Sequence, residues 1–199
     1  MKTLMYIHGF RSGANGSKGD QLRARFGDRY RIVVPELDAD PDSSLEKLNR
    51  AIASEKPDII VGTSLGGWMT LMSNSGEAQL VIVNPSLKPQ DTLSKWVEMP
   101  LEYFCRRQDG VQTYTLTQPV LDKYLKYDAL EAAKQKAGRL HALCSTADEL
   151  LGTAHADALA NILPPERLVI VDDFKHRCDG PGLEHLFDII EGLASTKAT

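Results

Sequence analysis

Ser64 lies in a segment whose residue types could supply a nucleophile. The stretch VGTSLGGWMT, residues 61–70, places this serine between Gly62 and Gly66, directly after an apolar run. It matches G-x-S-x-G, a pattern in which a strained strand-to-helix turn exposes the serine hydroxyl while the glycines let strand and helix approach closely. A small polar turn without chemistry would use the same residues. Ser64 is therefore a candidate nucleophile that needs a base.

His176 is the histidine that the sequence favours as the base that takes the serine proton. It lies in the loop DDFKHRCDGPG, after an apolar run and before the last helical pattern. In a parallel sheet this loop and the serine would share the edge at which the strands end. A solvated histidine among charged neighbours is the alternative. The other candidates fit less well: His141 lies within a strand pattern, and we expect His155 and His185 on solvated helical faces.

Asp148, in CSTADELLG, is the predicted acid that orients the imidazole and stabilises its charged form. It follows the apolar run 139–144 and completes the chain order serine, acid, histidine. Glu149, Asp172 and Asp173 compete for this role. The last two are close to the histidine in sequence, but they continue the preceding strand.

A tetrahedral intermediate would also need backbone N–H donors, which form an oxyanion hole. We expect one donor from Leu65, the residue after the serine. The second should be Phe10, in the segment His8-Gly9-Phe10 that follows the first apolar run. In this interpretation His8 orients the loop and is not a base; an ordinary turn after a strand is the alternative.

The elements that must position these residues alternate between apolar runs and helical patterns. We expect strands at residues 3–7, 30–34, 58–61, 80–83, 139–144 and 168–171, and helices at 18–27, after Ser43, at 65–74 and at 182–193. Ser43 and Glu46 have the spacing of a capping box, and Leu45, Leu48 and Ile52 fall on one helical face. Continuous apolar runs indicate strands buried on both faces. The predicted fold is a compact α/β fold, an open and mostly parallel sheet of about six strands with helices on both faces.

Residues 86–136 interrupt this alternation and hold six of the thirteen aromatic residues. We predict one domain over residues 1–199, in which this insertion folds as a helical lid or cap over the site. A fixed decoration packed on the sheet edge is the alternative.

Composition and charge narrow the class of protein. With 199 residues, 42% of them hydrophobic, and a net charge of −4, the chain has a proper core and lacks the basic face that nucleic-acid binding requires. We find no membrane-spanning run and no signal peptide, and the widely spaced Cys105, Cys144 and Cys178 suit reduced thiols in a cytoplasmic protein. The loop GFRSGANGSKG fits no phosphate-binding pattern. We therefore expect no cofactor and no metal, and the sequence makes no prediction of the oligomeric state.

Five segments, YIHGFRSG, VGTSLGGW, VIVNPSLKP, STADELL and KHRCDG, together resemble the YqiA/YcfP-type small bacterial α/β-hydrolases. The resemblance covers nearly the whole chain and is weakest from about Thr92 to Lys136. It implies a compact α/β-hydrolase sheet, a triad of Ser64, Asp148 and His176, and hydrolysis of small carboxylic esters or acyl thioesters without a cofactor. Some YcfP-type relatives lack the elbow serine, which this chain keeps. The surroundings of the histidine, KHRC, are more charged than in YqiA-like members.

Two further functions stay open from the sequence. The first is a catalytically silent binding or regulatory module that keeps the hydrolase shell. The second keeps the triad but performs a peptidase or C–C hydrolase reaction.

Overall fold

The computed structural model describes residues 1–195, and its main feature is a six-stranded parallel sheet with the strand order β2-β1-β3-β4-β7-β8. This confirms the predicted parallel α/β sheet; the last four residues of the predicted domain lie outside the described residues. The strands are β1 (Lys2–Ile7), β2 (Tyr30–Val33), β3 (Ile59–Thr63), β4 (Gln79–Val83), β7 (Leu140–Ser145) and β8 (Leu168–Val171). The longer helices are α1 (Ser17–Phe26), α2 (Pro41–Glu55), α3 (Leu65–Met72), α6 (Ala129–Lys136), α7 (Ala154–Ala160) and α8 (Pro181–Ser195).

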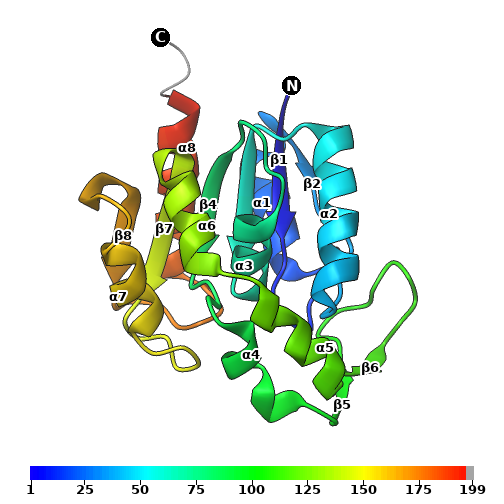
Figure 1. The fold of residues 1–199 in the computed structure, drawn as a ribbon. Coiled ribbons are helices and arrows are strands. Elements are labelled where there is room, and N and C mark those ends of the chain that lie inside the picture. Colours follow the sequence, from blue (N-terminus) through cyan, green and yellow to red (C-terminus); the bar gives the residue numbers. More distant parts are fainter. Residues whose placement is uncertain (196–199) are drawn as a thin grey trace.

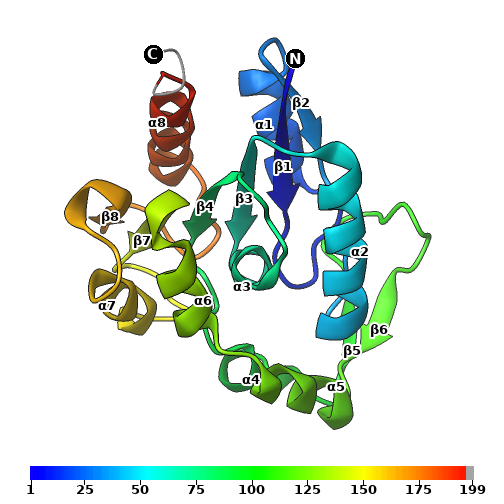
Figure 2. The same cartoon turned by 45° about the horizontal axis from the view of Figure 1, so that its top comes forward.

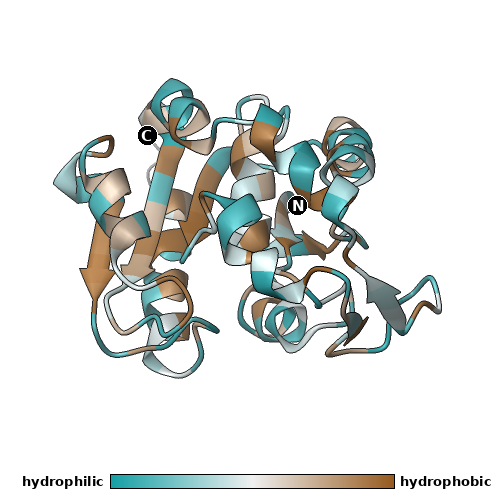
Figure 3. Cartoon of the chain, turned by 60° about the horizontal axis from the view of Figure 1, so that its bottom comes forward, coloured by the Kyte–Doolittle hydropathy of each residue, from teal (hydrophilic) through white to brown (hydrophobic). Residues whose placement is uncertain are grey.

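Helices cover both faces of this sheet, which explains the continuous apolar runs. Successive residues of a strand point to opposite faces. In β1, Met5 and Ile7 pack in the core with α2, α3, α6 and α7, whereas Leu4 and Tyr6 pack in the core with α1 and α8. The two helical layers and the apolar strands between them are visible in Figures 1 and 3. Across residues 1–195, no helix combines the length and apolar character needed to cross a membrane.

Helix α2 begins earlier than the predicted capping box. Its N-cap is Asp40, whose Oδ1 accepts the N–H groups of Asp42 at 3.0 Å and Ser43 at 3.4 Å. Pro41 occupies the first helical position, where a missing N–H has no consequence. The capping box at Ser43 is therefore wrong.

The order of the strands puts two loops side by side. The chain passes from β1 outward to β2 and then crosses to β3 on the other side of β1, so strands β1 and β3 flank the point at which the direction of winding reverses. Their register pairs Ile7 with Gly62. Residues 8–10 and Ser64 consequently leave the sheet together, at the kind of crevice in which open α/β sheets bind ligands.

The insertion, residues 86–136, folds largely beyond the ends of these strands, on the side opposite both termini (Figure 2). It contains α4 (Pro89–Thr92), an antiparallel pair β5 (Pro100–Glu102) and β6 (Thr113–Thr115), α5 (Gln118–Asp122) and α6. Tyr124 anchors it to the core, since its ring lies 4.8 Å from that of Trp68 and its hydroxyl donates to the Ala39 carbonyl at 2.7 Å. Whether the insertion moves as a lid stays a prediction.

Candidate active site

Ser64 sits on a strained turn between β3 and α3. Its φ and ψ are 54° and −119°, a backbone conformation that residues with a Cβ rarely adopt. The flanking glycines are required by space: a methyl at Gly62 would lie 2.3 Å from the Gly66 carbonyl oxygen, and one at Gly66 would lie 2.1 Å from the Ile7 carbonyl oxygen. Helix α3 thus rests directly against β1, and the turn holds the serine where the two strands end.

Three predicted site residues meet at this edge although they are far apart in sequence. The Nε2 atom of His176 lies 2.8 Å from Ser64 Oγ, and its Nδ1 lies 2.8 Å from Asp148 Oδ2. The ionised carboxylate accepts, so Nδ1 carries the proton and Nε2 is left to accept the serine O–H. Such a chain can remove the proton from a serine as it attacks.

Asp148 has surroundings that keep it charged. Its side chain is fully buried, and its Oδ1 accepts the N–H groups of Leu150 and Leu151, each at 2.9 Å. Burial alone would raise the pKa of this carboxyl, but the hydrogen bonds from His176 and from the two backbone N–H groups outweigh it. The pKa of Asp148 therefore lies below its usual value.

Two of the three competing acids, Glu149 and Asp173, have other partners. Glu149 Oε2 accepts the backbone N–H of His176 at 3.0 Å, and Asp173 pairs with His185 Nε2 at 2.9 Å. The structure describes all four candidate acids. Of these, Asp148 is the one whose carboxylate is hydrogen-bonded to the His176 ring.

Two residues that the sequence did not single out hold the loop of His176. Lys18 is buried, and its Nζ donates to the Cys178 carbonyl at 2.6 Å and to Asp179 Oδ1 at 3.1 Å. Asn84 Nδ2 donates to the His176 carbonyl at 3.4 Å. The backbone φ angles of Asn84 and of Cys178, in the loop of His176, are positive, at 40° and 54°. The position of Asn84 directly after a buried strand is the signal that could have pointed to it.

The loop after β1 lies against Ser64, and the side chain of His8 holds this loop in place. A methyl at Gly9 would lie 3.3 Å from Ser64 Cβ. His8 Nε2 accepts the N–H of Leu37 at 3.2 Å, so Nδ1 carries the proton and donates to the Gly9 carbonyl at 3.0 Å. Burial lowers the pKa of His8, which favours this neutral form. The side chain thus orients the loop, in agreement with the interpretation of the sequence.

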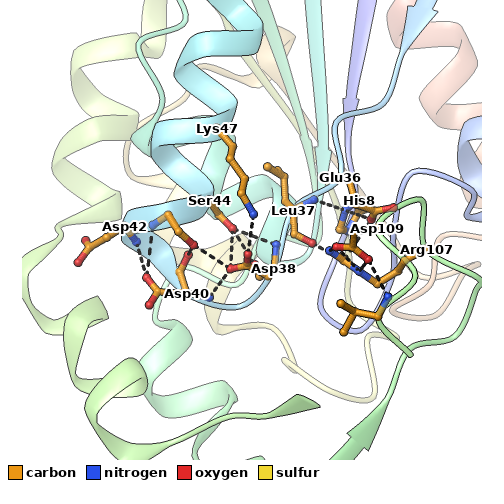
Figure 4. Close-up of polar contacts among 12 residues, drawn as sticks. His8, Glu36, Leu37, Asp38, Asp40, Asp42, Ser44, Lys47, Arg107 and Asp109 are labelled. Atoms are coloured by element: carbon orange, nitrogen blue, oxygen red, sulfur yellow. Dashed lines mark hydrogen bonds and ion pairs between the residues drawn. The ribbon is translucent and has the colours of Figure 1, made fainter. Parts of the chain in front are cut away.

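Behind His8, a buried charge network ties the loop to the insertion (Figure 4). The Arg107 side chain is 2% exposed; its Nη1 lies 3.1 Å from Glu36 Oε1 and donates to the Leu37 carbonyl at 2.6 Å. Glu36 Oε1 also accepts the N–H of Ala14 at 3.1 Å. The sequence analysis missed this network because Arg107 stands in the polar stretch RRQDG, which looks like a surface loop.

The remaining histidines have no place beside Ser64. His155 is buried rather than solvated, with Nε2 3.3 Å from Asn84 Oδ1, which corrects the expectation of a solvated face. His185 is partly exposed beside Asp173, and the half-buried His141 lies on β7 near Arg167.

A cleft of about 570 Å³ opens above the serine. Ser64 and His176 line it together with Phe10 and Leu65, the two residues predicted to donate their N–H groups. Helix α3 begins at Leu65, and the N–H groups of a first helical turn have no acceptor inside the helix. Within the described 195 residues, no cluster of three or more His, Cys, Asp or Glu side chains could hold a metal ion.

Sequence comparison matches this chain to a protein family. The model of the family described as "Uncharacterised protein family (UPF0227)" matches residues 3–191. A UPF0227 protein of Pectobacterium atrosepticum is 30% identical over 109 residues, which are 50% of this chain and 59% of that protein. A UPF0227 protein of Shewanella woodyi is 25% identical over 107 residues, 50% of this chain and 60% of that protein. The matches thus span about three fifths of the length of these curated relatives.

Solved structures share the fold at low sequence identity. Est1E of Butyrivibrio proteoclasticus with bound ferulic acid has a TM-score of 0.76 at 12% identity, covering 100% of this chain and 90% of that chain. A putative hydrolase of Agrobacterium vitis has a TM-score of 0.70 at 18% identity, covering 96% and 87%. A monoacylglycerol lipase of Paleococcus ferrophilus has a TM-score of 0.62 at 17% identity, covering 98% and 96%. At such identities the likeness shows the α/β-hydrolase fold.

Proposed function

Because the chain belongs to the UPF0227 family and has the α/β-hydrolase fold, we propose that it is a serine hydrolase of small carboxylic esters or acyl thioesters. One observation carries the proposal: two hydrogen bonds of 2.8 Å link Ser64 to His176 and His176 to Asp148 at the base of the cleft. The coarser inference, a hydrolase, draws further support from the esterases and lipases among the structural neighbours.

In the proposed mechanism Ser64 Oγ attacks the acyl carbon while His176 Nε2 takes its proton. The negative charge that develops on the carbonyl oxygen is received by the N–H groups of Phe10 and Leu65. Asp148 stabilises the imidazolium through Nδ1. Collapse of the tetrahedral intermediate breaks the bond to the alcohol or thiol, which leaves with the proton from Nε2.

The acyl-enzyme is then hydrolysed by the reverse use of the same groups. Water loses a proton to His176 Nε2 and attacks the acyl carbon, and the second intermediate expels Ser64 Oγ, which takes the proton back. The products are the free acid and the unchanged enzyme.

Replacement of the nucleophile tests the proposal. Ser64→Ala should lower kcat for p-nitrophenyl butyrate by about 10⁴-fold or more, because nothing replaces the attacking oxygen. Circular dichroism and the melting temperature should show a folded variant. A fluorophosphonate probe should label wild type at Ser64 and leave Ser64→Ala unlabelled. Retained hydrolysis in the variant would contradict the mechanism, and an unlabelled wild type would favour a silent binding module.

A further inference from the structure

Arg11 occupies an unusual place in the cleft. It directly follows Phe10, has a positive φ of 60°, and lines the same cleft as Ser64. Its guanidinium carbon lies 4.4 Å from the ring centroid of Phe104 and 5.5 Å from that of Trp96. Nε donates to the Glu102 carbonyl at 2.8 Å. The two terminal nitrogens, which form the planar fork of the guanidinium, donate to no protein acceptor within residues 1–195.

Two more cations border the same rings. Lys95 Nζ lies 5.5 Å from the Trp96 centroid, and the Arg177 guanidinium carbon lies 5.8 Å from that of Phe104. Both residues line the cleft. Phe104 is 63% exposed, so an apolar surface faces solvent between the positive charges.

The three carboxylates that line the cleft, all within residues 1–195, make their contacts with groups other than the guanidinium of Arg11. Asp20 Oδ1 accepts from Arg23 at 2.8 Å, Glu149 Oε2 accepts the His176 N–H at 3.0 Å, and Asp179 Oδ1 pairs with Lys18 at 3.1 Å. Asp179 Oδ2 also forms a long ion pair with Arg177 Nε, at 3.9 Å. The cleft lining has four cationic side chains, Arg11, Lys18, Lys95 and Arg177, against these three carboxylates, which leaves an excess of one positive charge in a chain whose net charge is −4.

We propose that the substrate carries an anionic group, a carboxylate or a phosphate, which binds the guanidinium of Arg11. This inference rests on the proposed hydrolase function and names its substrate class. An arginine fork matches the oxygens of either anion with two parallel hydrogen bonds. The contacts with the two rings and with Glu102 hold the side chain before the substrate arrives, so little rotamer freedom is lost on binding.

The position of Arg11 also limits the substrate. Phe10, whose N–H is to receive the oxyanion, is its neighbour in the chain, so the anion must lie within one side chain's reach of the scissile carbonyl. The linker between anion and ester is then short, and its apolar part lies against Trp96 and Phe104. Because this contact is made before and during the reaction alike, its loss should raise KM and leave kcat nearly unchanged.

Matched substrates test the proposal. For the acyl side, the p-nitrophenyl monoester of adipic acid is compared with the same compound methylated at its free carboxyl. For the alcohol side, 4-acetoxybenzoate is compared with its methyl ester, and 4-acetoxyphenyl phosphate with its dimethyl ester, which separates carboxylate from phosphate. In at least one pair, wild type should favour the anionic member in kcat/KM by about tenfold or more.

Variants locate the effect. Arg11→Gln should abolish most of this preference through KM, while Arg106→Gln, which changes an exposed arginine of the insertion outside the cleft lining, should preserve it. A merely structural role of Arg11 would lower kcat/KM for both members of a pair equally. In wild type the preference should also shrink as ionic strength rises from about 0.01 M to 0.5 M.

The outcomes separate the two proposals. Neutral esters cleaved as well as anionic ones, or an unchanged preference in Arg11→Gln, would overturn the anion site and leave the hydrolase intact. No ester hydrolysis and no fluorophosphonate adduct would overturn the hydrolase, and the substrate class with it. If Arg11→Gln does not fold, the substrate preference of wild type and the dependence of that preference on ionic strength still test whether the cleft binds an anion.

Discussion

Asp148→Asn is the change that most directly tests how His176 is held. The asparagine oxygen can still accept the N–H groups of Leu150 and Leu151, so the side chain should keep its position. Its NH2 group would then face His176 Nδ1, which must become the acceptor. The ring proton moves to Nε2, where it blocks removal of the serine proton. The corresponding loss in a Ser-His-Asp enzyme is about 10⁴-fold in kcat, or about 5.4 kcal/mol of transition-state stabilisation.

The assay compares kcat for p-nitrophenyl butyrate in wild type, Asp148→Asn and Glu149→Gln. Glu149 is the matched control, since its carboxylate accepts the backbone N–H of His176 rather than a ring N–H. An amide oxygen can keep that hydrogen bond without the charge, so we expect a loss of no more than about tenfold. A loss in Glu149→Gln as large as in Asp148→Asn would refute the assignment of the acid. A kcat of Asp148→Asn above a tenth of the wild-type value would refute the assignment as well.

Two predictions concern stability. Gly66→Ala would place a methyl 2.1 Å from the Ile7 carbonyl oxygen, so the free energy of unfolding measured in urea should fall by about 3 kcal/mol or more. The control is Gly138→Ala, which has nothing within 4 Å of the added carbon and should change this free energy by about 0.5 kcal/mol or less. Equal effects of the two changes would contradict the packing argument. The lowered pKa of Asp148 means that its ionised form stabilises the fold above the unfolded pKa of about 3.9 and that this stability is lost as pH falls through the folded pKa. In urea titrations below about pH 4, the free energy of unfolding of Asp148→Asn should therefore fall less steeply with decreasing pH than that of wild type. Parallel plots of this free energy against pH for the two proteins would contradict the linkage.

Local patterns in the sequence predicted the sheet and the turn at Ser64 well. Strands buried on both faces produce unmistakable apolar runs, and a glycine such as Gly66 is forced by the close approach of two backbones. The positions of Asp148 and His176 followed from topology, because every loop after a parallel strand reaches the same edge. Their catalytic roles stay predictions that the variants above test.

Contacts made over long sequence distances could not be predicted in the same way. The Nη1 atom of Arg107 meets Glu36 across the fold, and nothing near either residue signals that the arginine is buried. His155 was misplaced because α7 has only seven residues, too few for a clear periodicity. At α2, Asp40 with Pro41 competed with the box at Ser43 and formed the cap, because the proline is favoured at the first helical position.

The residues with positive φ have a consequence for which substitutions would stabilise this protein. Arg11, Ser64, Asn84 and Cys178 all hold such backbone angles, and all lie in the segments that follow β1, β3, β4 and β8. For residues with a Cβ each costs on the order of 1 kcal/mol, against a total stability of about 5–15 kcal/mol for a domain. Glycine at Ser64 would relieve that strain and remove the hydroxyl at once. Selection for heat resistance alone would therefore favour glycine at position 64, whereas the proposed chemistry requires the serine hydroxyl.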